Sequence, residues 1–328
     1  MTSPRSTKGR QALLFIAKLL VSGALILFVV SRISLSEVRE AMMAPHWGWL
    51  LSALVVYGLS AVAGAQQWAW ILHAGGIKAP VREISRLYFI GLFFNNFLPA
   101  NIGGDAYKII DLGRHEKKSM LVLCATVLDR IIGLSALTAL AVVAMVACTI
   151  FDIPLPGTAL LLIPVLIALF VILAVLLSRR LGSQLPRMFN KLGMTKLAGQ
   201  VEQLTTEIGC YREQVRFLNL VFLFSVGVQL LRMATHVLVA LGLGFALGST
   251  QMVQLLVLVP MLAVSLTLPV TINGIGLRES LSAELLIFAG IGGSQAVAME
   301  VAAYLVQVVF SLQGGLLLWW GRGNRSDR

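Results

Sequence analysis

The stretch Leu98-Pro-Ala-Asn-Ile-Gly-Gly-Asp-Ala-Tyr-Lys108 returns later in the chain as Leu268-Pro-Val-Thr-Ile-Asn-Gly-Ile-Gly-Leu-Arg278, with Leu-Pro, an isoleucine, glycine and a final cation in both copies. Each copy follows an uncharged apolar run, which is the composition of a membrane helix that is interrupted within the membrane. Paired interrupted helices in corresponding positions of two halves are typical of transporters and mark their binding sites. The sequence therefore predicts an internal repeat, with a site where the two breaks meet.

The composition is that of an integral membrane protein. Of the 328 residues, 58% are hydrophobic and only 12% are charged, whereas soluble domains carry about 25% charged residues. A run of about 20 uncharged residues is long enough to cross roughly 30 Å of hydrocarbon. Such runs predict six crossings, at residues 12–31, 47–72, 131–151, 153–178, 217–241 and 301–321, of which the first includes Lys18 and the fifth is interrupted by Arg232.

The positions of Lys and Arg predict the orientation of these crossings. With the N-terminus in the cytoplasm, almost all cations of the connecting segments lie inside, and the outside segments contain only Arg32 and Arg39, as the positive-inside rule requires. Both ends of the apolar segment 87–104 are then cytoplasmic, so this segment enters the membrane and turns back. The segment before Pro269 enters from the opposite side, which makes the halves an inverted repeat.

The expected fold class is therefore an all-α polytopic membrane protein with about six full transmembrane helices, two broken re-entrant segments and cytoplasmic termini. The expected organisation is a tail at 1–10, a single transmembrane domain at 11–321 and a tail at 322–328, the domain consisting of a first half at 11–178, a linker at 179–216 and a second half at 217–321. In the linker, apolar residues recur at helical spacing opposite charged ones, which predicts an amphipathic helix over 196–216 at the cytoplasmic interface. A linker that packs on the bundle is favoured over a gate.

The candidate site combines the two breaks with ionisable residues in apolar helices. Backbone groups freed at a break find no partner in lipid, so they must face protein or a water-filled cavity. Helix N-termini just beyond the glycines, together with Lys108 and Arg278, would favour an anionic group such as a phosphodiester. The expected substrate-binding residues are Asn96, Asn101, Gly103, Gly104, Asp105, Lys108, Asp129, Arg130, Arg232, Thr271, Asn273, Gly274, Gly276, Arg278 and Glu279.

Plainer roles compete for several polar residues. Asp129, Arg130 and Glu300 fit the membrane interface equally well, because the uncharged runs that follow them are already long enough to span. A lone helical histidine such as His236 is typical of packing. Gln67, next to two tryptophans in the sequence, fits a helix end with an aromatic belt. Whether Lys108 and Arg278 face a ligand or the nearby acids also stays open.

Catalytic signatures are absent from the sequence. There is no Gly-x-Ser-x-Gly, P-loop, His-Glu-x-x-His or dinucleotide fingerprint, and no soluble segment exceeds about 40 residues, too few for an attached catalytic domain. Cys124, Cys148 and Cys210 lack the spacing of metal ligands. We therefore expect no catalytic residues, no cofactor and no metal, and the dispersed cations argue against nucleic acid as a partner.

Three blocks in fixed order, at 94–108, 127–133 and 268–279, resemble the flippase-like transmembrane family of the lysylphosphatidylglycerol synthases. The resemblance extends roughly from residue 11 to 321. It implies a multi-pass protein of the inner (cytoplasmic) membrane that moves an anionic or modified phospholipid, or a lipid-linked sugar, between leaflets. Two-domain members carry a cytoplasmic aminoacyltransferase domain after this region. This chain stops at Arg328, so it resembles a stand-alone member, and transferase activity is not expected.

The favoured function is accordingly lipid translocation, with the head group bound between the two broken segments. The alternatives are a membrane subunit of a lipid aminoacyltransferase, similar to a phosphatidylglycerol lysyltransferase, or of a glycolipid-synthesis system, and a scaffold that recruits a separate enzyme. The expected partners are the lipid substrate and the membrane. A homodimer and a separate lipid-modifying enzyme stay open as further partners.

Overall fold

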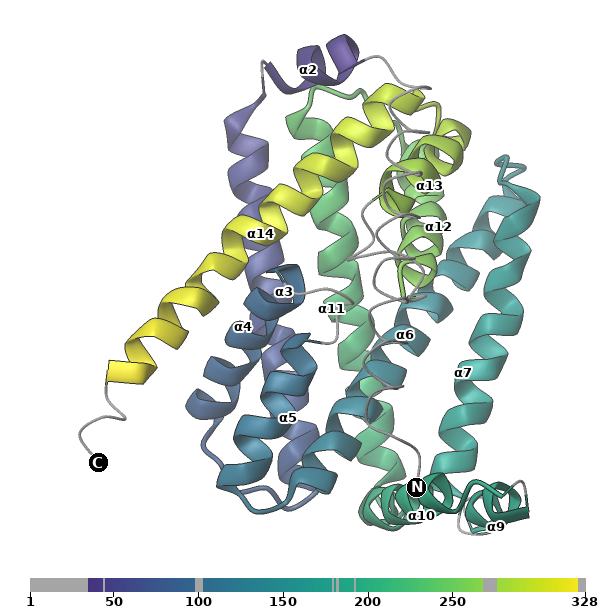
Figure 1. Ribbon diagram of the computed structural model, residues 1–328. Coiled ribbons are helices and arrows are strands. Elements are labelled where there is room, and N and C mark those ends of the chain that lie inside the picture. Colours follow the sequence, from purple (N-terminus) through teal and green to yellow (C-terminus); the bar gives the residue numbers. More distant parts are fainter. Residues whose placement is uncertain are drawn as a thin grey trace.

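The structure is a computed structural model that describes residues 35–43, 45–97, 103–178, 180, 183–191, 193–267 and 276–323 (Figure 1). The expected first crossing at 12–31 and the Leu-Pro breaks themselves lie outside these residues. Within them, every regular element is a helix: α2 (Leu35–Met43), α3 (Trp47–Ala74), α4 (Val81–Phe97), α5 (Gly103–His115), α6 (Ser119–Ile150), η1 (Gly157–Leu161), α7 (Leu162–Leu177), α9 (Gln184–Lys191), α10 (Thr195–Glu207), η2 (Ile208–Tyr211), α11 (Val215–Gly242), α12 (Ser249–Ser265), α13 (Leu277–Leu285), η3 (Leu286–Ala289) and α14 (Gly293–Gly323).

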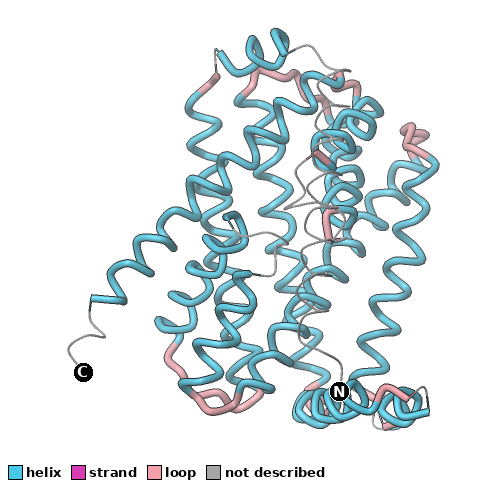
Figure 2. Tube along the Cα trace, viewed as in Figure 1, coloured by secondary structure: helices cyan, strands magenta, loops and turns pink. Residues whose placement is uncertain are grey.

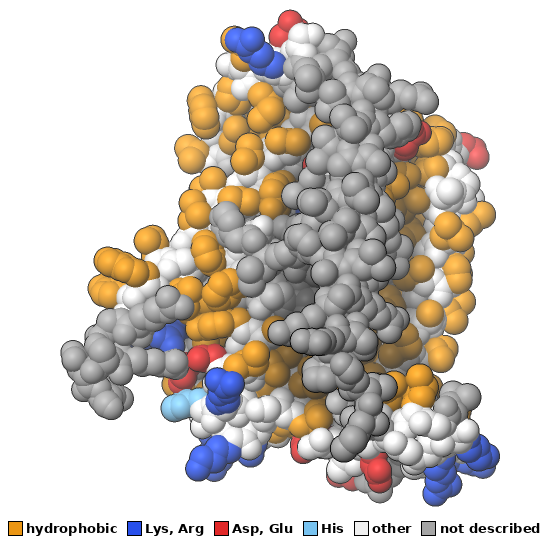
Figure 3. Space-filling view, in the orientation of Figure 1, with side chains coloured by type: hydrophobic (Ala, Val, Ile, Leu, Met, Phe, Trp, Pro, Cys, Tyr) orange, Lys and Arg blue, Asp and Glu red, His pale blue; other side chains and the backbone are white. Residues whose placement is uncertain are grey.

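Five helices of the described chain are long and apolar enough to span a membrane: Trp47–Ala74, Ser119–Ile150, Gly157–Leu177, Val215–Gly242 and Gly293–Trp320. They confirm five of the six expected crossings. Large apolar side chains such as Val55, Leu223 and Leu316 are exposed on their outer faces. In Figure 3, apolar side chains cover both flanks of the visible face, and Lys and Arg gather mainly toward its upper and lower ends. A lipid-facing belt of this kind is what a membrane-spanning bundle requires.

Corresponding helices of the two halves have matching lengths. Helices α3 and α11 both have 28 residues, and α4 and α12 both have 17. In each half the turn between these helices contains a glycine with positive φ, Gly76 at +90° and Gly244 at +80°, a conformation that other residues rarely adopt. The long closing helices, α6 and α14, have 32 and 31 residues. The duplication inferred from the breaks thus extends over most of the chain.

The two halves pack reciprocally. Helix α3 lies against its counterpart α11, α4 of the first half packs on α14 of the second, and α12 of the second half packs on α6 of the first. The hairpin of α4 and α5 has its outer loops at one end of the molecule, where α9 and α10 also lie. The segment containing α12 and α13 descends from the opposite end (Figures 1 and 2). This arrangement is the expected inverted repeat.

Two helices begin earlier than the uncharged runs suggest. Helix α6 starts at Ser119, so Asp129 and Arg130 lie inside it, and α14 starts at Gly293, so it includes Glu300. Asp129 and Glu300 lie inside these helices because their side chains face the cavity between the halves, and Arg130, which is half exposed, pairs with Asp105. A reading based on uncharged runs alone begins the helix only after such residues.

The linker packs on the bundle, although the single amphipathic helix expected over 196–216 is wrong. The helical path ends with η2 at Tyr211, and α11 begins at Val215 after a turn. The fully buried Tyr211 donates a hydrogen bond to the carbonyl of Ile71 at 2.8 Å, and the Gln214 amide donates to the carbonyl of Ala74 at 3.1 Å. These bonds join the linker to carbonyl groups at the end of α3, where the Ile71 carbonyl also accepts the N–H of Gly75. The helix of the linker ends here, although the periodic pattern continues.

Candidate functional site

A cavity of about 480 Å³ lies between the two halves, within the size range of ligand sites. Helices α3 to α6 of the first half and α11 to α14 of the second all contribute to its wall. The charged and titratable wall residues on which the following argument depends are Lys108, Asp129, Arg130, Arg232, His236, Arg278 and Glu300. Ionisable groups in apolar helices are costly unless they face a partner or a cavity, so this cavity explains their presence.

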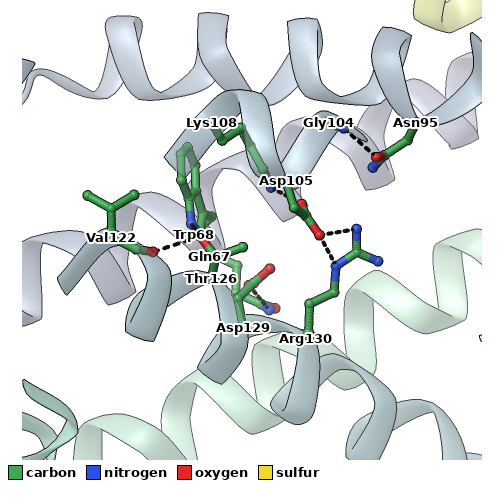
Figure 4. Close-up of polar contacts among 10 residues, drawn as sticks. All are labelled: Gln67, Trp68, Asn95, Gly104, Asp105, Lys108, Val122, Thr126, Asp129 and Arg130. Carbon is green, nitrogen blue, oxygen red and sulfur yellow. Dashed lines mark hydrogen bonds and ion pairs between the residues drawn. The ribbon is translucent and has the colours of Figure 1, made fainter. Parts of the chain in front are cut away.

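In the first half, Asp105 holds two cations. Its carboxylate forms an ion pair with Lys108 Nζ at 2.8 Å, which is not aligned as a hydrogen bond, and it receives Arg130 Nε at 2.9 Å and Nη2 at 2.7 Å (Figure 4). Asp105 lies in the first turn of α5, where the helix dipole favours a negative charge. Helix geometry brings Lys108 onto the same face three residues later. Both cations thus already have a counter-ion.

Lys108 is enclosed on its other sides by aromatic rings. Its Nζ lies 4.7 Å from the centre of the Trp68 ring and 5.0 Å from that of Tyr88, a cation–π arrangement. The Trp68 ring is fixed in turn by a 3.2 Å hydrogen bond from its Nε1 to Thr126. Lys108 is only 4% exposed. Its charge therefore contributes mainly to holding α5 against α3 and α4.

The glycines of the first copy serve helix packing. A Cβ on Gly104 would overlap the carbonyl group of Gly91 on α4, and the Gly104 N–H donates to Asn95 Oδ1 at 2.9 Å. The sequence predicts an open anion site at this N-terminus, where a ligand approaches the glycines closely. The structure does not have such a site at Gly104. The close approach is between two helices of one hairpin, and a side chain satisfies the amide.

Asp129 also has a partner within the first half. Its Oδ1 accepts a 2.7 Å hydrogen bond from Gln67 Nε2 on α3 (Figure 4). The expectation that Gln67 marks a helix end is wrong, since α3 continues to Ala74 and Gln67 is buried. An amide partner keeps a donor in front of the carboxylate at every pH.

The second half contributes two arginines without such partners. Arg278 stacks on the Tyr304 ring at 4.7 Å, and its buried Nη1 has no hydrogen-bond partner among the described residues. Glu279 does not neutralise it; the Glu279 carboxylate instead accepts the N–H of Gly276 at 2.7 Å as a helix cap. Arg232 lines the same cavity and has no ion pair with a described carboxylate. Two arginines thus line the cavity without a counter-ion among the described residues.

Glu300 and His236 form the remaining polar pair of this half. Glu300 is 2% exposed, and its Oε1 lies 3.6 Å from His236 Nε2, beyond hydrogen-bond distance. The other ring nitrogen, Nδ1, lies 3.1 Å from the carbonyl oxygen of Arg232. The packing role expected for His236 does not account for its position in the cavity wall.

The sequence located much of this site. Of the expected residues, Asn96, Lys108, Asp129, Arg130, Arg232 and Arg278 line the cavity. Gly103, Gly104 and Asp105 lie beside it in α5, and Gly276 and Glu279 form the cap of α13. Asn101, Thr271, Asn273 and Gly274 fall outside the described residues. Sequence reasoning missed the lining residues Tyr57, Gln67, Tyr88, Tyr304 and Gln307, since single polar residues in long apolar helices carry little signal.

Comparison with known proteins gives the family. Residues 15–315 match the family model described as the lysylphosphatidylglycerol synthase TM region. The chain is also similar to a UPF0104 membrane protein of Pyrococcus horikoshii, with 24% identity over an alignment that covers 92% of this chain and 95% of that protein. The chain therefore belongs to the lysylphosphatidylglycerol synthase transmembrane family and is a multi-pass membrane protein, and its resemblance to that family is confirmed.

Proposed function

We propose that this family member is a lipid translocase that moves an anionic or modified phospholipid, or a lipid-linked sugar, between leaflets. The observation that carries the proposal is the cavity between the two inverted halves, where Arg232 and Arg278 have no described carboxylate partner. Cations without counter-ions are costly inside an apolar bundle, even when they are only partly buried. An anionic ligand would remove that cost.

A phosphodiester suits these side chains. Arginine presents several N–H donors in a planar fork that matches the oxygens of a phosphate group. The polar cavity wall would replace the hydration shell that the head group leaves behind, while the acyl chains stay in lipid beside the apolar outer faces of the helices. The expensive part of lipid transfer, moving a charge through hydrocarbon, would thereby become a movement within protein.

The inverted repeat suggests how the cavity would change sides. In transporters of this construction, one repeat rocks against the other around a site near the membrane midplane. Here the re-entrant helix of each half packs on the long closing helix of the other. A shift of one half would therefore rearrange the cavity wall, to which both halves contribute. We propose alternating access of this kind. The cations at the end formed by α9 and the α5–α6 loop support placing that end in the cytoplasm and the protein in the inner membrane.

The proposal is tested by transfer of a fluorescent phosphatidylglycerol in proteoliposomes. Replacing Arg278 or Arg232 with glutamine should reduce the transfer rate at least about tenfold, since a hydrogen bond to a charged group contributes about 1.5–3 kcal/mol. Arg114→Gln is the control, because Arg114 is exposed at the end of α5, and it should transfer lipid at the wild-type rate. Equal rates in all four proteins would contradict the proposal.

A further inference from the structure

The pair of His236 and Glu300 requires a proton that fixed charges do not supply. Both ring nitrogens of His236 face oxygen atoms: Nδ1 faces the Arg232 carbonyl at 3.1 Å, and Nε2 faces Glu300 Oε1 at 3.6 Å. A carbonyl oxygen only accepts, so Nδ1 must carry a hydrogen to bond with it. A neutral imidazole has one N–H, which leaves a lone pair on Nε2. That lone pair would then meet the lone pairs of a carboxylate.

One additional proton resolves this conflict. It can reside on Nε2, giving an imidazolium that donates to the Glu300 carboxylate, or on Oε1, giving a carboxylic acid that donates to Nε2. A small movement of either side chain would close the 3.6 Å separation to a hydrogen bond. The proton would also give a partner to Glu300 Oε1, which is buried without a hydrogen bond in the described structure. The pair with this proton is neutral overall, and without it carries one negative charge.

The pair lies one helical turn from Arg232 and one helical turn from Tyr304, the ring on which Arg278 stacks. His236 follows Arg232 by one turn of α11 and is bonded to its carbonyl group. Glu300 precedes Tyr304 by one turn of α14, and Arg278 stacks on the Tyr304 ring. A negative charge on the pair would therefore attract the arginines and repel an anionic ligand.

The other titratable groups of the cavity do not take the place of this pair. Lys108 and Arg130 are held by Asp105, and Asp129 accepts from the amide of Gln67. Histidine ordinarily changes its charge between pH 5 and 8. Of the described residues in the wall, His236 and Glu300 are thus the two titratable groups that face one another.

We propose that His236 and Glu300 form a proton-binding site whose occupancy is linked to anion binding at Arg232 and Arg278. This rests on the proposed function for the identity of the anion. A proton enters from the aqueous phase that the cavity reaches, binds between Nε2 and Oε1, and cancels the negative charge in front of the arginines. By reciprocity, an anionic head group then increases the affinity of the pair for the proton, and loss of the proton weakens the head group's binding.

The linkage is tested with the purified full-length protein in weakly buffered detergent solution near pH 7. Addition of short-chain phosphatidylglycerol should cause proton uptake, up to about one proton per protein, recorded with a pH indicator. Glu300→Gln and His236→Gln should bind the lipid without uptake. Glu284→Gln, which changes an exposed acid on α13, should take up protons as the wild type does. Binding without uptake in the wild type, or undiminished uptake in Glu300→Gln, would overturn the linkage.

A second measurement separates failure of this site from failure of the proposed function. Without lipid, acid–base titration of the wild type and of the double variant His236→Gln/Glu300→Gln between about pH 5 and pH 8 should differ by about one bound proton, with loss of the protonated-pair signal from the infrared spectrum of the variant. If the curves coincide, the proton site is wrong whatever the protein transports. If they differ while no anionic lipid binds, the proton site stands and the lipid proposal fails.

Discussion

The two halves share helix lengths and packing but use their charged residues differently. In the first half, Asp105 pairs with Lys108 and Arg130, and Asp129 accepts from an amide. In the second half, the corresponding cation, Arg278, has no described counter-ion. The acid of α14, Glu300, faces a histidine in place of an amide.

This difference suggests a division of labour between the copies. A closed ion-pair cluster and an amide partner fix geometry, as befits a supporting wall. In the proposed function, the two arginines without a described counter-ion bind the anion, and the pair of His236 and Glu300 binds the proton. On that proposal one copy is a rigid wall and the other supplies the ligand-binding side chains.

The largest effect separating the halves is expected for Asp105→Asn. This change leaves the buried ammonium of Lys108 without a carboxylate, and breaking a buried ion pair costs about 3–5 kcal/mol. The free energy of unfolding in mixed detergent micelles should fall by about that amount, while Glu300→Gln in the second half should lower it much less. Equal losses in the two variants would remove the distinction between the halves.

A smaller loss of stability is expected for Gly104→Ala. The added Cβ would overlap the carbonyl group of Gly91 and force α4 and α5 apart, and overpacking of this kind costs about 1–3 kcal/mol. Gly293→Ala in the second half is the matched control, since its Cβ would meet Ala283 Cβ at an ordinary 3.7 Å. Thermal unfolding should show a lower midpoint for Gly104→Ala alone. A normal midpoint would show that the hairpin does not depend on this contact.

Placing a histidine in the supporting half would sharpen the contrast further. Gln67→His would set an imidazole beside Asp129, as His236 stands beside Glu300 in the other half. Lipid transfer should then acquire a second pH-dependent step of about fivefold, the lower range of coupling between linked sites. The measurement is the pH profile of transfer in proteoliposomes. A profile identical to that of the wild type would contradict the proposal that the side chain facing the acid, an amide or a histidine, determines the pH response.

The smallest effect is expected outside the cavity, at the linker. Tyr211→Phe removes the hydrogen bond to the carbonyl of Ile71 and leaves a buried acceptor with one partner fewer, which should cost about 1 kcal/mol. The free energy of unfolding should fall by this amount. The rate of lipid transfer, measured where the variant is fully folded, should not change. Loss of transfer in a variant that is still folded would give the linker a gating role in place of packing.

The sequence predicted the fold to the extent that membrane physics dictates it. Uncharged runs located five crossings, and the repeated Leu-Pro segments located both hairpins, because lipid excludes charge and exposed backbone. The predicted starts of α6 and α14 were wrong because Asp129 and Glu300 lie inside these helices. From the sequence alone, an acid that faces the interior cannot be distinguished from one at the membrane interface. The linker helix was overextended because its apolar periodicity continues past the turn at 212–214.

The site was less accessible from the sequence for a different reason. Lys108 and Arg278 occupy equivalent positions in the repeat, and only the fold shows that the first meets Asp105 and the second stacks on Tyr304. Partners such as Gln67 and His236 are brought in from helices distant in the chain. Pairings of this kind depend on tertiary packing, which no local pattern encodes.

The most direct test of the division between the halves is calorimetric binding of short-chain phosphatidylglycerol to Arg278→Gln and Lys108→Gln. If the second half binds the head group, Arg278→Gln should weaken binding at least about tenfold, the loss expected for a hydrogen bond to a charged group. Lys108→Gln, whose charge already pairs with Asp105, should bind within about threefold of the wild type. Unchanged binding by Arg278→Gln, or a greater loss in Lys108→Gln, would contradict this account.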